Sequence, residues 1–471
     1  MKKESRKRFR AAVRILLVMM GVLAVTGCHK KEKGSIYQAQ TGQQEEKTGG
    51  AEKETAFRLY LGEISAECSP FEYFTAGDER LLSLVYSRVQ EVADISVEQN
   101  TPEKGRTRYR ITLRQELRDK NGNCLTADAL LFNYYLRCQT NYRGCDTVNE
   151  MKIVGLEEYQ YGVRGKKLQK RRKKVREMLK YPTKELANAL RKEIVLPELK
   201  REYAWTQTLY FDSSQDELTG KYPQISMLFA RYFAADTTYT GKNKTRKQVL
   251  LDIARQYGGN LKGLSRVTGK EYTGAARAVA IQQLYGKQGG GDGKISGIRK
   301  RDDTTVEIVT EGYQKEDRQR LGEIFLLSRF PSCGQKDTEQ FPLGCGEYYV
   351  AKQNSEKLVL CSNSNAWQGK PQIEELFIDT GKERGKGEGT AVRCVKKIAE
   401  DELDMAVVWE RVDKEKKSIR QILGTGDNAW KVAAQGGVLY STQRVNGTTI
   451  PEKMTPDKDV ISNMGNIKRN K

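Results

Sequence analysis

The chain has 471 residues, with 82 Lys or Arg, 61 Asp or Glu and a single His, which gives a formal net charge of +21. The lone histidine, His29, excludes a Ser-His-Asp triad, a Cys-His pair and any histidine-based metal site elsewhere in the chain. The length allows two or three domains with a large core. The sequence therefore gives no residue set that supports an enzyme, and it indicates no cofactor and no metal.

The N-terminal segment has the layout of an export signal. A basic leader precedes an apolar run at 11–25, which is shorter than the about 20 apolar residues that span a bilayer. The run ends in small residues before Cys28. This predicts a signal peptide at 1–27, and VTGC at 25–28 resembles the lipobox of bacterial lipoproteins, whose cysteine sulfur takes a diacylglyceryl group. The alternative is an ordinary signal peptide with an incidental cysteine.

Lipidation at Cys28 implies an exported protein held to the outer face of the cell membrane, as in Gram-positive bacteria. Residues 1–27 hold seven basic residues and one glutamate, a net +6 of the +21, so the remainder carries +15. Such a charge suits nucleic acid, an anionic lipid or wall polymer, or a solvated surface. Export argues against nucleic acid, and the dense basic cluster at 166–174 has no interleaved aromatic residues. A solvated surface is favoured, with attraction to the envelope second.

The first half of the chain alternates strands and helices. Residues 28–56 are polar and predict a flexible tether that follows the lipidated cysteine. Alternating apolar residues predict strands at 57–62 and 107–114, and helical spacing predicts a helix at 78–90. Thr126 is a suitable N-cap for the helix that follows it.

A charged helical segment is predicted from about 157 to 294. Helix breaks are expected at Pro182 and Pro197, and a further helix is expected to close near Gly258. The glycine-rich stretch at 286–294 predicts a flexible joint, because its glycine and lysine spacing does not fit a phosphate loop.

Strands return after this segment, at 295–300 and 304–310, and a hairpin is predicted at 347–363. A last clear strand is expected at 373–379, and a helix leading into a strand is expected at 396–408. After about residue 446 the sequence is polar and weakly patterned. This mixture of strands and helices predicts an α/β architecture.

Eight cysteines remain besides Cys28, and an exported chain is able to pair them. No CxxC motif occurs, and Cys138 and Cys145 are close enough in sequence to bridge. Free buried cysteines are the favoured interpretation. The eight are Cys68, Cys124, Cys138, Cys145, Cys333, Cys345, Cys361 and Cys394.

Three segments together resemble the family 5 extracellular solute-binding proteins, the oligopeptide- and dipeptide-type receptors of ABC importers. They are ITLRQELRDKNGNCLTADALLF at 111–132, PLGCGEYYVAK at 342–352 and NSNAWQGKPQIEELFI at 363–378. The first is similar to the family's strand, Asp-Gly turn and Thr-Ala-Asp helix start. The second is similar to Pro-x-Gly-Thr-Gly-Pro-Tyr, with Cys345 in place of Thr, and the third is similar to Asn-x-x-Trp-x-Gly-x-Pro.

The resemblance implies a periplasmic-binding-protein-like (class II), two-lobed α/β architecture with mixed sheets. Residues 57–383 are expected to form the N-terminal lobe, with a helical insertion at about 157–294. Residues 384–471 are expected to begin a second lobe that is incomplete, as in a truncated product, with a disordered tail.

The resemblance also implies a monomeric, lipid-anchored receptor that captures a peptide or similar small solute and delivers it to ABC permease subunits. The loop of Gly344, Cys345 and Gly346 is expected to hydrogen-bond an extended ligand, beside Tyr348 and Trp367. A tight turn is the alternative for the glycines, and core packing is the alternative for Trp367. The alternative for the whole chain is a degenerate or truncated surface lipoprotein that binds anionic envelope polymer through its basic face and has no transport role.

Overall fold

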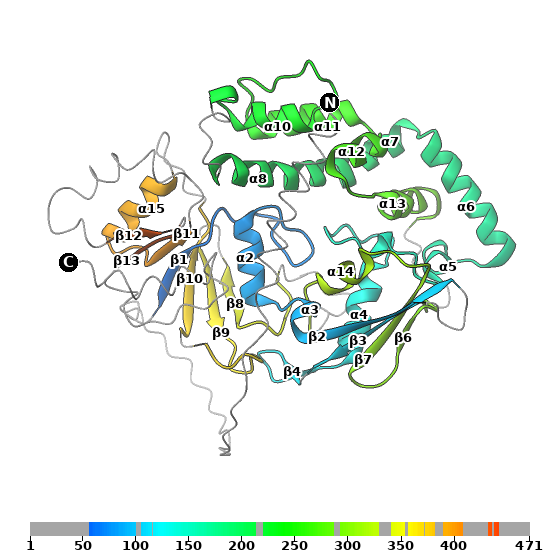
Figure 1. Cartoon of the computed structure of the whole chain (residues 1–471), viewed down its shortest axis with the longest axis horizontal. Coiled ribbons are helices and arrows are strands. Elements are labelled where there is room, and N and C mark those ends of the chain that lie inside the picture. The colour runs from blue at the N-terminus through cyan, green and yellow to red at the C-terminus, as the bar shows by residue number, and fades with distance from the viewer. Residues whose placement is uncertain are drawn as a thin grey trace. The chain divides into compact units, whose positions relative to one another are not determined.

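The computed structural model describes the chain in pieces that begin at residue 56 and end at residue 441. These residues form a mixed α/β fold, which confirms the predicted class (Figure 1). The predicted signal peptide, Cys28, most of the tether and the tail after residue 446 lie outside the described residues. The described ranges are 56–99, 105–114, 116–212, 220–286, 293–328, 341–353, 357–371, 373–381, 390–407, 432–435 and 438–441.

Within the described residues, seven strands form one sheet, called the large sheet here. Its central strand β1 is parallel to both of its neighbours, and the remaining pairs are antiparallel. The predicted hairpin at 347–363 is confirmed as β8 and β9. The order is β12 (Val432–Gln435), β13 (Val438–Ser441), β11 (Met405–Val407), β1 (Phe57–Tyr60), β10 (Glu375–Asp379), β9 (Lys357–Ser362) and β8 (Tyr348–Gln353).

Helices lie on both faces of the large sheet. Helix α2 (Ala76–Val85) buries Leu81 and Leu84 in one apolar core with Leu59 of β1. Side chains alternate between the faces of a strand, so Tyr60 points to the opposite face. There the Arg393 guanidinium of α15 (Thr390–Ala399) lies over the Tyr60 ring.

The strands β11, β12 and β13 fall in the range 384–471 that was predicted to begin a second lobe. They lie in the large sheet, through the pairing of Met405 with Leu59 and of Ala406 with Tyr60. The boundary of a second lobe at residue 384 stays a prediction. The sequence pattern identified the helix and the strand but contained no information about the partner of that strand.

A second, antiparallel sheet, called the small sheet, comprises β2 (Ala93–Gln99), β3 (Arg106–Leu113), β7 (Thr305–Glu311) and β6 (Ile298–Lys300) among the described residues. Helix α4 (Ala127–Arg137) packs on it, and Tyr109, Ile111 and Ile308 are buried between them. The predicted N-cap is confirmed, because the Thr126 side chain accepts a hydrogen bond from the Asp128 N–H.

Among the described residues, five short elements belong to the same part of the chain as the small sheet. They are α3 (Val89–Val92), β4 (Leu117–Arg118), β5 (Cys124–Leu125), the 3₁₀ turn η1 (Val148–Glu150) and α14 (Asp317–Gly322).

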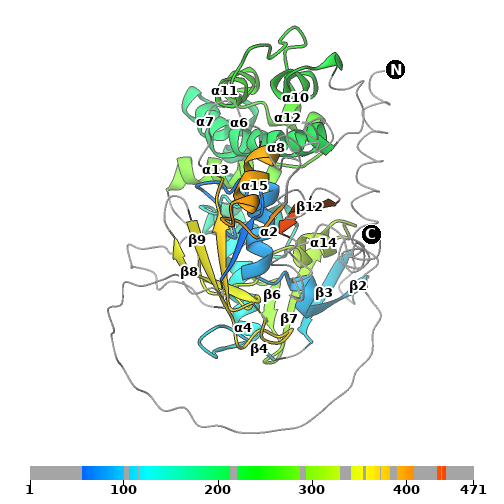
Figure 2. The same cartoon turned by 90° about the vertical axis from the view of Figure 1, so that its left-hand side faces the viewer.

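The helical segment predicted at 157–294 is present and encloses a core of its own, which includes Phe229, Val249 and Ile281 (Figures 1 and 2). Its helices separate β3 from β7 in sequence, as an insertion does. They are α5 (Leu156–Tyr161), α6 (Gly165–Lys180), α7 (Lys184–Leu190), the π-helical η2 (Arg191–Val195), α8 (Leu196–Asp212), α10 (Ile225–Phe233), α11 (Arg246–Tyr257), α12 (Leu261–Thr268) and α13 (Thr273–Tyr285).

One of the two predicted proline breaks is wrong. Helix α6 ends before Pro182 as expected, but α7 continues through η2 into α8, and Pro197 is the second residue of α8. Proline is tolerated in the first turn of an α-helix, where its missing N–H would not be bonded within the helix. The π-helical turn before it resets the hydrogen-bond register and provides such a start.

The cysteines divide between core and surface. No disulfide joins any two of the seven described cysteines, the alternative pair Cys138 and Cys145 included. Four of the seven are buried, while Cys124 is exposed. Burial and nearby Asp146 raise the pKa of the Cys138 thiol to about 12, so the neutral thiol is the stable form.

Candidate functional site

The three segments that carry the family resemblance meet at one place in the fold. Asn365 donates from Nδ2 to the carbonyl oxygens of Asp119, at 3.1 Å, and Lys120, at 3.3 Å, which ties the third segment to the first. Asn363 donates from Nδ2 to the Gly346 carbonyl oxygen at 2.9 Å, which ties the third segment to the second. Residues 119–123, 342–349 and 363–369 therefore form one hydrogen-bonded unit, called the motif cluster.

A buried carboxylate organises the turn at 119–123. Asp119 accepts hydrogen bonds at Oδ1 from the N–H groups of Asn121, at 2.9 Å, and Asn123, at 3.0 Å. Its Oδ2 accepts from Ser328 Oγ at 3.1 Å. Gly122 has φ of +79°, a conformation that L side chains rarely adopt. The geometry of the turn thus explains both the carboxylate at Asp119 and the glycine at Gly122.

The two glycines predicted to approach a ligand lie against the C-terminal end of helix α2. A Cβ atom at Gly344 would lie 2.4 Å from Cδ1 of Tyr86, and one at Gly346 would lie 2.4 Å from the carbonyl carbon and oxygen of Val85. The Gly346 N–H also donates to the Val85 carbonyl oxygen at 3.1 Å. Glycine is required at both positions because the loop passes directly over the end of α2.

The other predicted ligand contacts lie in packed surroundings. Cys345 is fully buried and belongs to the core of the small sheet. Tyr348, the first residue of β8, is buried in the core of the large sheet and donates from its hydroxyl to the Ile373 carbonyl oxygen at 3.1 Å. Trp367 is partly buried and donates from Nε1 to Ser87 Oγ at 2.9 Å. The motif cluster therefore joins the two cores, and ligand contact by these residues stays a prediction.

Replacing Trp367 by Phe separates packing from ligand contact. The replacement keeps an aromatic ring, although a smaller one, and removes the hydrogen bond to the buried Ser87 hydroxyl, so we expect the free energy of unfolding to fall by about 2 kcal/mol. We expect the stabilisation produced by a bound solute to stay as in the unaltered chain, measured by thermal melts with and without solute. Loss of that stabilisation with unchanged intrinsic stability would instead identify Trp367 as a ligand contact.

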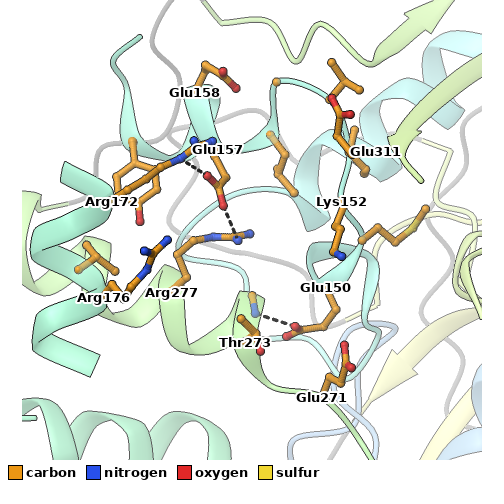
Figure 3. Close-up of a pocket in the computed structure, with 18 of the residues that line it drawn as sticks. Glu150, Lys152, Glu157, Glu158, Arg172, Arg176, Glu271, Thr273, Arg277 and Glu311 are labelled. Atoms are coloured by element: carbon orange, nitrogen blue, oxygen red, sulfur yellow. Dashed lines mark hydrogen bonds and ion pairs between the residues drawn. The ribbon is translucent and has the colours of Figure 1, made fainter. Parts of the chain in front are cut away.

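A separate hollow of about 900 Å³ opens where the insertion meets the small sheet (Figure 3). The ends of β3 and β7 contribute Arg106 and Glu311, and the segment 150–158 forms the floor. Helices α6 and α13 form the remaining walls. Its volume lies within the range of small-molecule sites. The hollow is not apparent from the sequence, because its lining comes from segments far apart in the chain.

Two carboxylates in the hollow have their charges satisfied by the protein. Glu150 accepts from the N–H groups of Gly274, at 2.6 Å, and Ala275, at 2.9 Å, and so caps the start of α13. Glu157 accepts from Arg277 Nη1 at 3.0 Å and also pairs with Arg172 (Figure 3). Burial is the largest influence on Glu150 and raises its pKa despite these hydrogen bonds.

Other charged groups lining the hollow face it without such pairing. Among the described residues, Lys152 and Arg176 form no ion pair within 4.0 Å, and neither do Glu158 and Glu271. The hollow thus offers two cations and two carboxylates to a solute. A ligand that carries both an ammonium and a carboxylate group matches this lining, because each of its charges finds an opposite one.

The described residues contain neither a membrane-spanning helix nor a metal site. None of the helices in these ranges combines the length and apolar character needed to cross a membrane. Over the same ranges, no group of three or more His, Cys, Asp or Glu side chains is arranged to hold a metal ion.

Comparison with known proteins gives matches among solved structures alone. No protein-family model matches the sequence, and no curated protein does. An oligopeptide-binding protein of Borrelia burgdorferi matches with a TM-score of 0.39 and 12% identity, over 77% of this chain and 49% of that one. Haemophilus influenzae OppA, complexed with the peptide RPPGFSPFR, matches with a TM-score of 0.36 and 11% identity, over 79% and 50%.

The oligopeptide-binding protein AppA of Bacillus subtilis, solved with a nonapeptide, matches with a TM-score of 0.36 and 9% identity, over 78% of this chain and 46% of that one. This chain therefore spans about half the length of the structures it resembles. The B. burgdorferi and B. subtilis structures are described as oligopeptide-binding proteins, and the H. influenzae structure contains a bound peptide.

Proposed function

We propose that this chain is a lipid-anchored, extracytoplasmic solute-binding protein that captures peptides, or a similar small solute, for an ABC importer. The observation that carries the proposal is the motif cluster. Three segments that resemble one family are spread over residues 111–378, yet they interlock through side-chain hydrogen bonds. Fortuitous matches to three unrelated stretches would have no reason to meet in space.

The charges of the hollow support a zwitterionic solute. A short peptide has an ammonium group at one end and a carboxylate at the other. Either Lys152 or Arg176, which lie on opposite sides of the hollow, is suited to bind the carboxylate (Figure 3). Either Glu158 or Glu271 is suited to bind the ammonium group. In this proposal the hollow receives the solute, and the motif cluster joins the cores of the two sheets.

The anchor and the partners follow from the sequence. Cys28 carries the lipid, and several acyl chains on one residue hold a protein firmly to a bilayer, since each buried methylene contributes about 0.8 kcal/mol. Residues 29–56 provide reach above the membrane. The proposed partners are the solute and the permease subunits of an importer, with the receptor acting as a monomer on the outer face of the cell membrane.

A thermal melt with and without a pool of short peptides tests the proposal, using residues 28–471 with Cys28→Ser. A ligand at a hundred times its dissociation constant stabilises the folded state by about 2.7 kcal/mol, so an upward shift of the midpoint is expected. Sugars and nickel ions serve as other solute classes. A shift with either of these, and none with peptides, would contradict the peptide assignment.

Paired charge reversals locate the site. Lys152→Glu with Arg176→Glu is expected to abolish the peptide-induced shift, because a solute carboxylate would then meet two negative charges. Lys242→Glu with Lys262→Glu makes the same change of charge at exposed lysines outside the hollow and is expected to leave the shift intact. If the peptide-induced midpoint shift were the same in both double variants, the hollow would not be the peptide-binding site.

A further inference from the structure

Helix α6 presents different side chains on its different sides. Of its 16 residues, nine are Lys or Arg and one is Glu. Leu168 and Val175 are buried in the core of the insertion. At about 100° per residue, the side that is turned away from this core spans an arc of about 140°. That arc carries Lys166, Lys167, Lys170, Lys173, Lys174, Glu177 and Lys180, all exposed.

The basic side chains of α6 are sorted by type. Its three arginines turn toward the protein: Arg171 donates to the Tyr161 carbonyl oxygen at 2.5 Å, Arg172 pairs with Glu157, and Arg176 lines the hollow. The exposed arc holds lysines and no arginine. Arginine forms fixed, two-pronged contacts, whereas lysine is a flexible point charge that suits a diffuse partner.

The start of α6 breaks local rules of helix stability. Arg164 at the N-cap makes no capping hydrogen bond, and Gly165 has φ of +58°. Lys166 and Lys167 place positive charge at the positive end of the helix dipole. Lys166 and Lys170 are four residues apart, an arrangement that destabilises a helix when the charges are alike. Lys170 and Lys174 repeat it.

Such violations on one exposed face are expected where a function maintains them. An anionic partner would reverse each of these unfavourable terms, because it would compensate the repulsion along the arc and the charge at the N-terminus. Figure 1 shows α6 as an outlying helix of the insertion, at the right of the view. The arc therefore points outward from the insertion core.

We propose that the outer face of α6, defined by the six exposed lysines, docks on the surface of an anionic lipid bilayer. A second observation favours lipid over a soluble polymer. Tyr181, at the C-cap of α6, is 72% exposed, and an amphipathic aromatic ring in that position suits the boundary between headgroups and acyl chains. The inference extends the proposed function, because an anchor at Cys28 would hold the chain close to such a surface.

The arc acts as a row of point charges, each of which gains attraction as it nears the negative lipid surface. This attraction is screened by salt over a distance of about 10 Å at 0.1 M. Orientation follows, because a chain attached by its lipid and resting on α6 presents a fixed side to the membrane.

Flotation with vesicles tests the inference, using residues 28–471 with Cys28→Ser so that no lipid is attached. Vesicles of phosphatidylcholine with phosphatidylglycerol are compared with pure phosphatidylcholine. We expect binding to the anionic vesicles alone, lost at high salt. Replacing Lys170, Lys173 and Lys174 together by Glu is expected to weaken binding at least about tenfold, and Tyr181→Ser is expected to weaken it further.

The matched control replaces exposed Lys242, Lys262 and Lys315 by Glu, which makes the same change of charge elsewhere. Equal loss in the control and the α6 variant would overturn the inference, as would equal binding to neutral vesicles. Preferential binding of a soluble glycerol-phosphate polymer over vesicles would overturn the membrane assignment in favour of a wall polymer.

A neutral variant guards against misfolding. If the Glu replacements at the three α6 lysines prevent folding, Gln replacements at the same positions are tested for vesicle binding in their place. Circular dichroism checks that this variant is folded. None of these lysines lines the hollow. The peptide-induced melt shift should therefore survive in the variants, which keeps a failure of the docking inference separate from a failure of the proposed function.

Discussion

Replacing Glu198 of α8 by Ala is expected to lower the free energy of unfolding by about 3 kcal/mol. The Glu198 side chain is 3% exposed. It accepts a hydrogen bond from Lys270 Nζ at 2.5 Å and another from Arg201 Nη2 at 3.0 Å. Truncation leaves two cations facing each other without their shared anion. This loss of stability is at the lower end of the range for removing one partner of a buried ion pair, because Lys270 is 40% exposed and water compensates part of its charge.

The same cluster gives the stability a defined pH dependence. Burial raises the pKa of Glu198, but the attraction of Lys270 and then Arg201 outweighs it and lowers the pKa to about 2. A carboxyl group whose pKa is lower in the folded state than in the unfolded state stabilises the fold fully at pH values above its unfolded-state pKa. This contribution is lost as the pH falls toward the folded-state pKa. The contribution of Glu198 is therefore expected to be complete above about pH 4.5 and to fade toward pH 2.

Urea denaturation at pH 7, 4 and 3 measures both effects. At pH 7 the Glu198→Gln variant should have a much lower free energy of unfolding than the unaltered chain. The difference in free energy should become smaller as the pH falls. Glu177→Gln is the control, because the Glu177 carboxylate is 65% exposed and lies 4.0 Å from Lys173. Its effect is expected to stay within about 0.5 kcal/mol. A gap that is constant with pH would show that the charge of Glu198 is not the stabilising feature.

Replacing Gly346 by Ala is expected to cost about 3 kcal/mol. The added methyl would stand 2.4 Å from two backbone atoms of Val85, and backbone at the end of α2 has little freedom to move aside. The shift would also strain the hydrogen bond that Asn363 donates to the Gly346 carbonyl oxygen. We therefore expect loss of stability together with loosening of the motif cluster.

Chemical denaturation measures the stability, and hydrogen exchange of the Gly346 and Asn365 amides reports on the cluster. Gly220→Ala provides the control, since a methyl there meets nothing within 4 Å. The free energy of unfolding of the Gly220→Ala variant should stay close to that of the unaltered chain. A Gly346→Ala variant with unaltered stability would mean that the loop does not pass against α2 as described.

Local features were predictable from the sequence where the signal was local. Alternation identified the β8–β9 hairpin, and Thr126 identified the start of α4. The strand β2 was missed, although Ala93, Ile95 and Val97 alternate, because the pattern is short and directly follows a helix. The helix break predicted at Pro197 was wrong because the effect of a proline depends on the hydrogen-bond register of the turn before it.

The candidate sites needed the fold. Nothing in the sequence around Gly344 and Gly346 indicates which backbone they approach, since Val85 and Tyr86 lie more than 250 residues earlier. The hollow is assembled from the edge of the small sheet, the segment 150–158, α6 and α13. Pairing of Glu157 with Arg172 and Arg277 likewise arises only when separate helices pack.

The position of β1 constrains the order in which this chain is able to fold. Both strands that flank β1 come from the far end of the sequence, and Arg58 donates its N–H to Asp404, 346 residues away, at 2.7 Å. Because a chain is made from its N-terminus, β1 has two open edges until nearly all of the described residues have followed it. The helical insertion, with contacts closer in sequence, can form early, whereas the large sheet closes late and slowly. The strand nearest the proposed anchor is thus the first to emerge and among the last to be held in place.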